Sequence, residues 1–386
     1  MTTTIRTREP RELLALIPFQ LGFRPRESAV VVSVRSHRSR VGLVARVDLD
    51  VLSDPEHGPV LARSLVQHLV RDGAGAVVLV LYTALDVRGV DAAVATAAHA
   101  HLAEAAAHFL GEPSTWVVGE TGWHGLGCAD ALCCPPGGRP LDDLDAAAVS
   151  AEMVLRGASV APRREDLGDI GRACARDRRS ARRAAARWSA RRAACEDPRD
   201  LHRWRQASLD LWREALDRLA AAARDVVDDD GTRVDDGVSA RAFLPASPVL
   251  GRLRAALEDV LVRDAVLLLL IPGTGRVPDR LVAGDVGEEV GAALQRVVDP
   301  ACGVPPEEAV VLAAERLLRG VGSHVSDHPA PPTLLALLAW WRGDGARAGV
   351  LLERALELDP SYRLAVLVEE ALTHGMPPGW LAPSRH

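Results

Sequence analysis

The chain has 386 residues, of which 48% are hydrophobic and 25% charged, and its formal net charge is −6 at pH 7. These proportions are ordinary for a globular protein, and the length exceeds what one hydrophobic core usually serves, so we expect two domains. The negative charge excludes a protein that binds nucleic acid through its charge as a whole. The longest apolar runs, at residues 77–81 and 266–271, are too short to span a membrane. Arg6 and Arg8 precede no apolar signal core, so we predict a cytoplasmic protein without a membrane partner.

The first elements predict a hairpin of two strands. Residues 13–17 favour a short helix that ends before Pro18, followed by a turn into a strand. Residues 29–34 are mostly β-branched and, except for Ser33, apolar, which is typical of a strand buried on both faces. After a polar turn at residues 36–40, apolar and polar residues alternate over residues 41–49. This alternation predicts a second strand that pairs with the first.

Helices and strands then alternate as far as about residue 150. Residues 60–71 have helical apolar spacing and stop at Asp72-Gly73, residues 76–82 form another buried strand, and residues 90–110 are an alanine-rich helix. Residues 115–119 predict a further strand. The order β-β-α-β-α-β indicates a mixed sheet, and we assign residues 1–150 to an α/β domain that includes a loop rich in cysteine and proline.

Beyond residue 149 the pattern is helical almost without a break. We expect a basic helical segment at residues 151–235, an acidic break at residues 228–237, and an all-helical domain at residues 236–386. The predicted helical segments are residues 170–195, 201–227, 248–271, 306–319, 333–342, 350–358 and 361–372.

Residues 330–375 resemble one tetratricopeptide repeat. Small residues stand where two helices would touch, a glycine stands at the turn and a proline follows the second helix. No convincing second copy is present, and a stable binding array usually needs at least three repeats, so we expect this hairpin to pack on its own domain rather than to form a peptide groove. The residues at the spacing of the repeat are Leu335, Ala336, Gly343, Ala348, Leu352, Ala355 and Pro360.

Four residues near the end of the α/β domain are candidate zinc ligands. His124, Cys128, Cys133 and Cys134 supply imidazole and thiolate groups, and the neighbouring glycines and prolines would let the loop curl around an ion. The spacing differs from the usual Cys-x-x-Cys pair. The alternatives are a tight loop with inert, buried thiols and a redox-active pair formed by Cys128 and Cys133, which a reducing cytoplasm disfavours.

An arginine-rich segment predicts a cationic helix face. Its arginines step by four, three, four and four residues, which places them on one side of a helix, opposite Ala181, Ala184 and Trp188. Such a face could contact phosphates. It could equally be solvated, or neutralised by the acidic residues between Asp225 and Asp236. The chain contains arginine but no lysine. The presence of arginine at these positions is therefore no evidence that they bind phosphate or carboxylate groups in a bidentate manner. The arginines are Arg172, Arg176, Arg179, Arg183 and Arg187.

A polar edge is expected beside the first hairpin. Arg46, Asp48 and Asp50 would project from one face of the second strand, and Arg24 and Glu27 lie just before the first strand, close to Ser28. We prefer a solvent-facing row of ion pairs to a charged pocket at this edge.

Several of these motifs together resemble a known family. They are residues 18–25 with Ser28, Arg46-Val47-Asp48, Cys128 with residues 133–136 and Gly138, residues 151–165, and residues 343–362. The family consists of uncharacterised bacterial proteins, is catalogued as a domain of unknown function, and is common in high-GC Gram-positive genomes. The resemblance implies no activity. Residues 120–125 depart from the polar stretch with aromatic, serine and tyrosine residues that the family often has before its first cysteine.

The sequence contains no nucleophile elbow, zinc-protease motif or dinucleotide fingerprint, and residues 272–276 lack the ending of a phosphate loop. We therefore predict a non-enzymatic, cytoplasmic binding or regulatory protein whose partner is a protein. Two alternatives stay open. One is a nucleic-acid-associated protein that uses the arginine helix, and the other is an enzyme or zinc-binding protein that uses the loop from Cys128 to Cys134.

Overall fold

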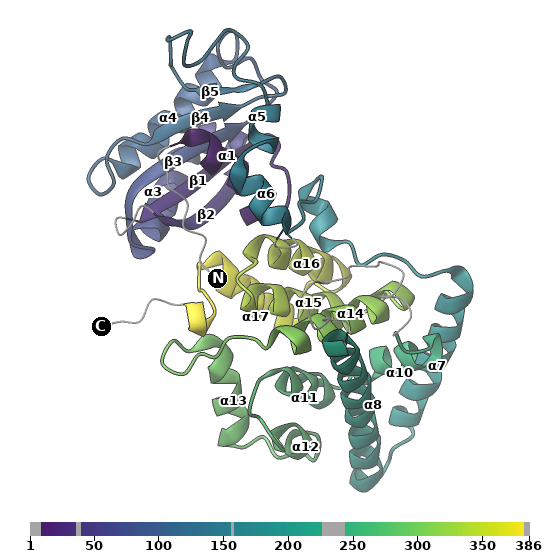
Figure 1. Ribbon diagram of the computed structural model, residues 1–386. Coiled ribbons are helices and arrows are strands. Elements are labelled where there is room, and N and C mark those ends of the chain that lie inside the picture. Colours follow the sequence, from purple (N-terminus) through teal and green to yellow (C-terminus); the bar gives the residue numbers. More distant parts are fainter. Residues whose placement is uncertain (1–8, 36–39, 156–157, 226–243, 382–386) are drawn as a thin grey trace. The chain divides into compact units, whose positions relative to one another are not determined.

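The computed structural model describes residues 9–35, 40–155, 158–225 and 244–381 (Figure 1). The chain divides into two compact units between Leu167 and Gly168, called here the α/β unit and the helical unit. Each unit has its own hydrophobic core. Residues 36–39 of the polar turn expected at residues 36–40, and the whole acidic break expected at residues 228–237, lie outside the described residues.

Within its described residues, the α/β unit contains a five-stranded sheet in the order β2-β1-β3-β4-β5. β1 is antiparallel to both β2 and β3, β3 is parallel to β4, and β5 is antiparallel to β4. This mixed sheet confirms the predicted fold class and adds β5, a three-residue strand that the sequence did not reveal. The strands are β1 (Ser28–Arg35), β2 (Arg40–Asp48), β3 (Ala74–Tyr82), β4 (Ser114–Val118) and β5 (Trp123–Gly125).

Helices cover both faces of this sheet (Figure 1). The core on one face joins alternate residues of β1 and β3, such as Ala29 and Leu79, to the first helical layer. On the other face Ala15 and Leu16 pack with Ala147 and Val149. Burial on both sides explains why the predicted strand at residues 29–34 is apolar except for Ser33. The layers are α2 (Leu49–Ser53), α3 (Gly58–Arg71) and α4 (Ala92–Ala106) on one face, and α1 (Pro10–Leu21), α5 (Asp142–Asp145) and α6 (Ala148–Leu155) on the other.

The predicted end of the first helix before Pro18 is wrong, because α1 continues through Pro18 to Leu21. A proline inside a helix lacks an N–H donor and costs about 3 kcal/mol. Burial of the helix face that carries Leu14, Ile17 and Leu21 outweighs this local penalty. The helix ends at Gly22, whose φ of 77° is the left-handed conformation that favours glycine at a helix end.

The helical unit has one contiguous core. The helix expected at residues 248–271 is two helices, because Asp259 interrupts it and caps the second one by accepting from the N–H groups of Leu261 and Val262. We did not predict α12 or α13. The helices are α7 (Ala175–Ala193), α8 (Pro198–Asp225), α10 (Ser247–Ala256), α11 (Val260–Leu270), α12 (Val277–Val282), α13 (Glu288–Val298), α14 (Glu308–His324), α15 (Ala330–Trp341), α16 (Gly345–Leu358) and α17 (Arg363–Thr373).

The hairpin expected near the C-terminus is formed by α15 and α16. Gly343 turns the chain with φ 87°, and the Asp344 side chain accepts from the N–H of Arg347 at 3.0 Å to begin α16. The likeness of this hairpin to a tetratricopeptide repeat stays a prediction. In the described part of the chain, no helix combines the length and the apolar character that crossing a bilayer requires.

Candidate ligand cavity, cysteine cluster and arginine stripe

A cavity of about 1210 Å³ lies in the α/β unit where β3 and β4 end. We call it the strand-end cavity. It is lined by the last residue of each strand and the two residues after it, which are Tyr82, Thr83 and Ala84 for β3 and Val118, Gly119 and Glu120 for β4. The carboxyl ends of parallel strands are where α/β proteins commonly bind ligands. Its apolar walls come mainly from α1 and α6, through Leu14, Ala15, Pro18, Phe19, Ala151, Val154 and Leu155.

Glu27 joins the loop before β1 to the end of β3. Its φ of 42° is unusual for a residue other than glycine. One carboxylate oxygen accepts from the Thr83 hydroxyl at 2.8 Å and the other from the N–H of Ala84 at 2.7 Å. These two hydrogen bonds hold the strained residue and fix its carboxyl group at the cavity wall.

Further charges surround this carboxylate. Arg24 and Asp145 form an exposed ion pair at 3.4 Å, which contributes little to stability. Arg26 and Glu120 also line the cavity, and neither makes an ion pair within the described residues. The N–H of Thr83 donates to the carbonyl of Val118 at 3.1 Å, so the ends of β3 and β4 lie side by side. The lining thus carries two guanidinium groups and three carboxylates, the latter on Glu27, Glu120 and Asp145.

Of the predicted polar edge, Arg24 and Glu27 line this cavity, whereas Arg46 and Asp48 lie outside it. Arg46 and Asp48 form an ion pair at 2.6 Å on β2, and the Arg46 Nε donates to the buried Ser28 hydroxyl at 2.8 Å. Neither residue is part of the lining. The placement of Asp50 on the strand was wrong, because β2 ends at Asp48 and Asp50 lies in α2.

Three of the four predicted metal ligands converge. The sulfur atoms of Cys128, Cys133 and Cys134 all lie within 4.8 Å of one another, and we call these residues the cysteine cluster. The two loop ends meet in a pair of backbone hydrogen bonds between Trp123 and Arg139, of 2.9 and 2.8 Å. A closed, hydrogen-bonded loop therefore positions the three thiols.

His124 lies on the other side of β5. It pairs with Val117, which belongs to the core against α4. The next residue, Gly125, faces the opposite way, and a Cβ built on it would lie 3.5 Å from the Cβ of Cys128. Alternation along the strand therefore turns His124 away from the cysteine cluster. Burial, together with the charge of Arg88, lowers the pKa of His124, so the imidazole is neutral near pH 7.

The helix α7 carries four of the five predicted arginines on one exposed face. Arg176, Arg179, Arg183 and Arg187 make no ion pair within the described residues, and we call them the arginine stripe. The expected fifth member, Arg172, precedes the helix, in an irregular segment where the N–H of Ala173 donates to the carbonyl of Ser323. The side chains of the acidic residues between positions 225 and 236 lie outside the described part of the chain.

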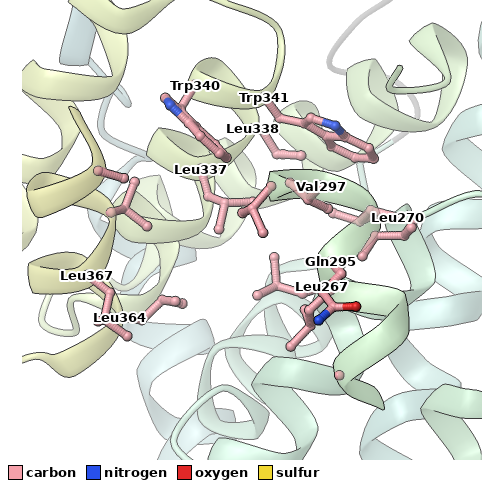
Figure 2. Close-up of a pocket in the computed structure, with 16 residues that line it drawn as sticks. Leu267, Leu270, Gln295, Val297, Leu337, Leu338, Trp340, Trp341, Leu364 and Leu367 are labelled. Carbon is pink, nitrogen blue, oxygen red and sulfur yellow. The ribbon is translucent and has the colours of Figure 1, made fainter. Parts of the chain in front are cut away.

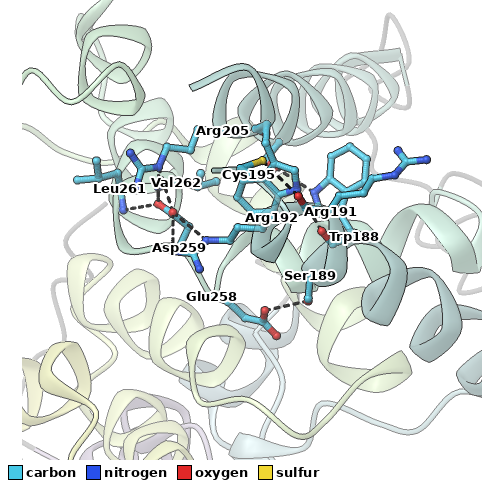
Figure 3. Close-up of polar contacts among 12 residues, drawn as sticks. Trp188, Ser189, Arg191, Arg192, Cys195, Arg205, Glu258, Asp259, Leu261 and Val262 are labelled. Atoms are coloured by element: carbon cyan, nitrogen blue, oxygen red, sulfur yellow. Dashed lines mark hydrogen bonds and ion pairs between the residues drawn. The ribbon is translucent and has the colours of Figure 1, made fainter. Parts of the chain in front are cut away.

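Other arginines at the end of α7 and on α8 are used inside the helical unit (Figure 3). Asp259 is 1% exposed and accepts from Arg192 at 3.1 Å and from Arg205 at 3.0 Å. The indole N–H of Trp188 donates to the Ser208 hydroxyl, which anchors the apolar side of α7. This end of the helix is therefore structural, whereas the arginine stripe remains accessible.

The helical unit also contains a pocket of about 280 Å³ between α11, α13, α15 and α17, shown in Figure 2 and called here the apolar pocket. Its two tryptophans donate hydrogen bonds through their indole N–H groups, Trp340 to the carbonyl of Met376 and Trp341 to the carbonyl of Val304. Among the described lining residues, Gln295 is left as the polar side chain that could bind a ligand.

The α/β unit is thus a mixed sheet between two helical layers with a ligand-sized cavity at its strand ends, and the chain continues into an all-helical unit. A family model described as Domain of unknown function (DUF4192) matches residues 10–379, and the chain belongs to that family. This confirms the resemblance seen in the sequence. No curated protein and no solved structure matches the chain.

Proposed function

We propose that this protein binds a small amphipathic molecule in the strand-end cavity, with an apolar body and a cationic or hydrogen-bond-donating end. The observation that carries the proposal is the composition of this one cavity. Carboxylates of Glu27 and Glu120 stand at the two strand ends, and apolar side chains of α1 and α6 form the facing walls. Ligand sites commonly combine apolar walls with a few convergent polar groups in a volume of roughly 300–1,000 Å³.

Exposed apolar side chains on α6 support this proposal. Val154 and Leu155 are 62% and 88% exposed although they line the cavity. An apolar ligand body would remove part of this surface from water, at about 25 cal/mol for each Å² buried.

The engagement of the polar groups supports binding rather than nucleophilic catalysis. Both oxygens of Glu27 accept hydrogen bonds from β3 and the residue after it, and the Ser150 hydroxyl donates to the carbonyl of Leu144 at 3.0 Å. A catalytic serine would instead face a base within hydrogen-bonding distance. The proposal therefore keeps the predicted non-enzymatic binding protein but replaces the predicted protein partner with a small molecule.

Crystal violet, an apolar aromatic cation, is a suitable probe, and its fluorescence rises when it is immobilised. We expect saturable binding that Ala151→Trp weakens at least about tenfold, because the indole would fill the cavity from exposed α6. Ala148→Trp is the matched control, since Ala148 is exposed on the same helix but does not line the cavity. Glu120→Gln should also weaken binding. Equal affinity in all three variants would contradict the proposal.

A second candidate function is polyanion binding by the arginine stripe. The supporting observation is that Arg176, Arg179, Arg183 and Arg187 are exposed and unpaired within the described residues, while Arg192 and Arg205 are paired with Asp259. We expect a labelled DNA duplex to bind with an affinity that falls steeply with salt.

The variant for this test is Arg179→Glu with Arg183→Glu, which should abolish DNA binding. The matched control is Arg203→Glu with Arg218→Glu, which changes the charge equally at exposed arginines of α8 that are paired with Asp200 and Glu214. Equal loss in both double variants would show an effect of net charge alone and would exclude the stripe as a site.

A further inference from the structure

The cysteine cluster has the sulfur spacing of a metal thiolate site. The Sγ atoms of Cys133 and Cys134 are 3.8 Å apart, and all three sulfurs lie within 4.8 Å of one another. Tetrahedral zinc with Zn–S bonds of about 2.3 Å needs sulfur atoms about 3.8 Å apart. Adjacent cysteines usually diverge, so the convergence of this pair with Cys128 needs an explanation in the loop.

The loop between Trp123 and Arg139 is built to hold these thiols. The N–H of Cys134 donates to the Asp130 carbonyl at 2.7 Å, and the N–H of Gly125 donates to the Cys134 sulfur at 3.3 Å. A hydrogen bond of this kind orients a sulfur atom that ligates a metal. At Gly138, which has φ 83°, a Cβ would lie 2.9 Å from the Trp123 nitrogen, so glycine allows the loop to close.

Two guanidinium groups bind the outside of the same loop. Arg139 donates through Nε to the carbonyl of Cys133 at 2.7 Å, and Arg88 donates through Nη1 to the carbonyl of Pro135 at 2.8 Å. Three thiolates and a divalent ion leave a net charge of about −1, which nearby positive charge offsets. Outer contacts of this kind orient the ligands of metal sites.

We propose that Cys128, Cys133 and Cys134 bind one zinc ion as thiolates and leave its fourth position to water or an external ligand. Each thiol loses its proton on binding, so three protons are released for each ion bound. His124 is not a ligand, because β5 turns its side chain toward the core on the other face of the sheet. The site therefore takes three thiolates rather than the mixed set of four that the sequence suggested.

The test is cobalt titration of the full-length protein, stripped of metal and kept reduced with a thiol-free reductant. We expect about one cobalt per chain, with the intense near-ultraviolet charge-transfer band of cobalt thiolates, and displacement of cobalt by zinc. Cys133→Ser with Cys134→Ser should abolish the band. Cys302→Ser is the matched control, since Cys302 is an exposed free cysteine of the helical unit. His124→Gln should retain the band.

A second measurement does not depend on the folding of variants. Alkylation of the wild-type chain followed by peptide mass spectrometry should show that zinc protects Cys128, Cys133 and Cys134, while the exposed Cys174 and Cys302 react with or without zinc. Absence of the thiolate band in the reduced protein, or equal alkylation of the cluster with and without zinc, overturns the proposal. A disulfide within the cluster that persists in the reduced preparation would overturn it as well.

Discussion

The strand-end cavity and the apolar pocket of the helical unit offer different chemistry to a ligand. The first, of about 1210 Å³, is lined by five charged side chains and by loop residues after two strands. The second, of about 280 Å³, is lined by four helices, and Gln295 alone among the described lining residues offers a free polar side chain. Strand ends leave polar loops at a cavity wall, whereas packed helices satisfy their own backbone and present an apolar stripe.

Apart from the arginine stripe, several charged groups of the helical unit are used for its own stability. Asp259 binds Arg192 and Arg205, and Arg254 binds Glu258 and Asp327. In the strand-end cavity, by contrast, Glu120 and Arg26 make no ion pair within the described residues. The comparison indicates that the apolar pocket is a feature of packing, whereas the strand-end cavity has polar groups available for recognition.

The largest expected difference between the two cavities is the loss of stability when a wall residue is truncated. Leu338 is fully buried beside the apolar pocket, and Leu338→Ala should lower the free energy of unfolding by about 3 kcal/mol. Val154 is 62% exposed in the strand-end cavity, and Val154→Ala should cost less than about 0.5 kcal/mol while weakening crystal violet binding. Chemical denaturation measures both effects, and a similar loss of stability in the two variants would remove the distinction.

The contribution of the ion pairs inside the helical unit to its stability can be tested by substituting Asp259. Asp259→Ala removes the cap of α11 and the partner of Arg192 and Arg205, so it should destabilise the unit by about 2 kcal/mol. The estimate stays below that for a fully buried pair because the arginines are 40% and 20% exposed. Thermal unfolding measures the change. An unaltered transition would mean that the network contributes nothing.

Two half-buried carboxyls, Asp72 in the α/β unit and Asp344 in the helical unit, should change stability with pH in opposite directions. Burial alone would raise the pKa of Asp72, but hydrogen bonds from Arg35, from the N–H of Leu43 and from Ser33 outweigh it and lower that pKa. Burial raises the pKa of Asp344. Asp72 therefore stabilises the fold above the pKa of an unfolded aspartate, about 4, and this contribution disappears as pH falls through the lowered value. For Asp344, stability should instead rise as pH falls through the raised value.

The corresponding variants are Asp72→Asn and Asp344→Asn, measured by denaturation from pH 7 to pH 3. Asp72→Asn should cost about 1–2 kcal/mol at pH 7, because a charged hydrogen-bond acceptor is lost, and progressively less in acid. Asp344→Asn keeps a capping side chain and should leave stability at pH 7 unchanged or slightly higher. A cost that is the same at every pH would show that ionisation has no part in either effect.

The smallest expected effect is a gain in stability at Gly291. This glycine is inside α13 and lines the apolar pocket, and a Cβ on it would meet nothing within 4 Å. Gly291→Ala should stabilise the helical unit by about 0.5–1 kcal/mol, because alanine has the higher helix propensity. Thermal unfolding would show a higher transition temperature. A lower one would mean that the glycine has a role that its open surroundings do not reveal.

The sequence predicted the elements whose signals are local. The β-branched run in β1 and the glycine stop after α3 are properties of a few neighbouring residues, and the structure has both. Two predictions are wrong. The first helix does not end before Pro18, because burial overrides the proline in α1, and the single helix expected at residues 248–271 is divided in two by the capping carboxylate of Asp259. The three residues of β5 are too few for a periodic signal.

The strand-end cavity was harder to predict because its residues come from distant parts of the chain. Glu27, Thr83 and Glu120 meet only when β1, β3 and β4 are placed in order, and that order depends on pairing that composition does not reveal. A usable signal was present, since polar residues follow two buried strands at their carboxyl ends. The position of His124 relative to the cysteines likewise depends on which face of β5 it occupies.

The most direct test of the central claim is the crystal violet titration of the wild-type protein, Ala151→Trp and Ala148→Trp side by side. Gly291→Trp, which would fill the apolar pocket, reports any dye that binds there instead. Binding in the strand-end cavity predicts a loss of affinity of at least about tenfold in Ala151→Trp alone. Loss in Gly291→Trp with unchanged affinity in Ala151→Trp would place the ligand in the apolar pocket and contradict the account.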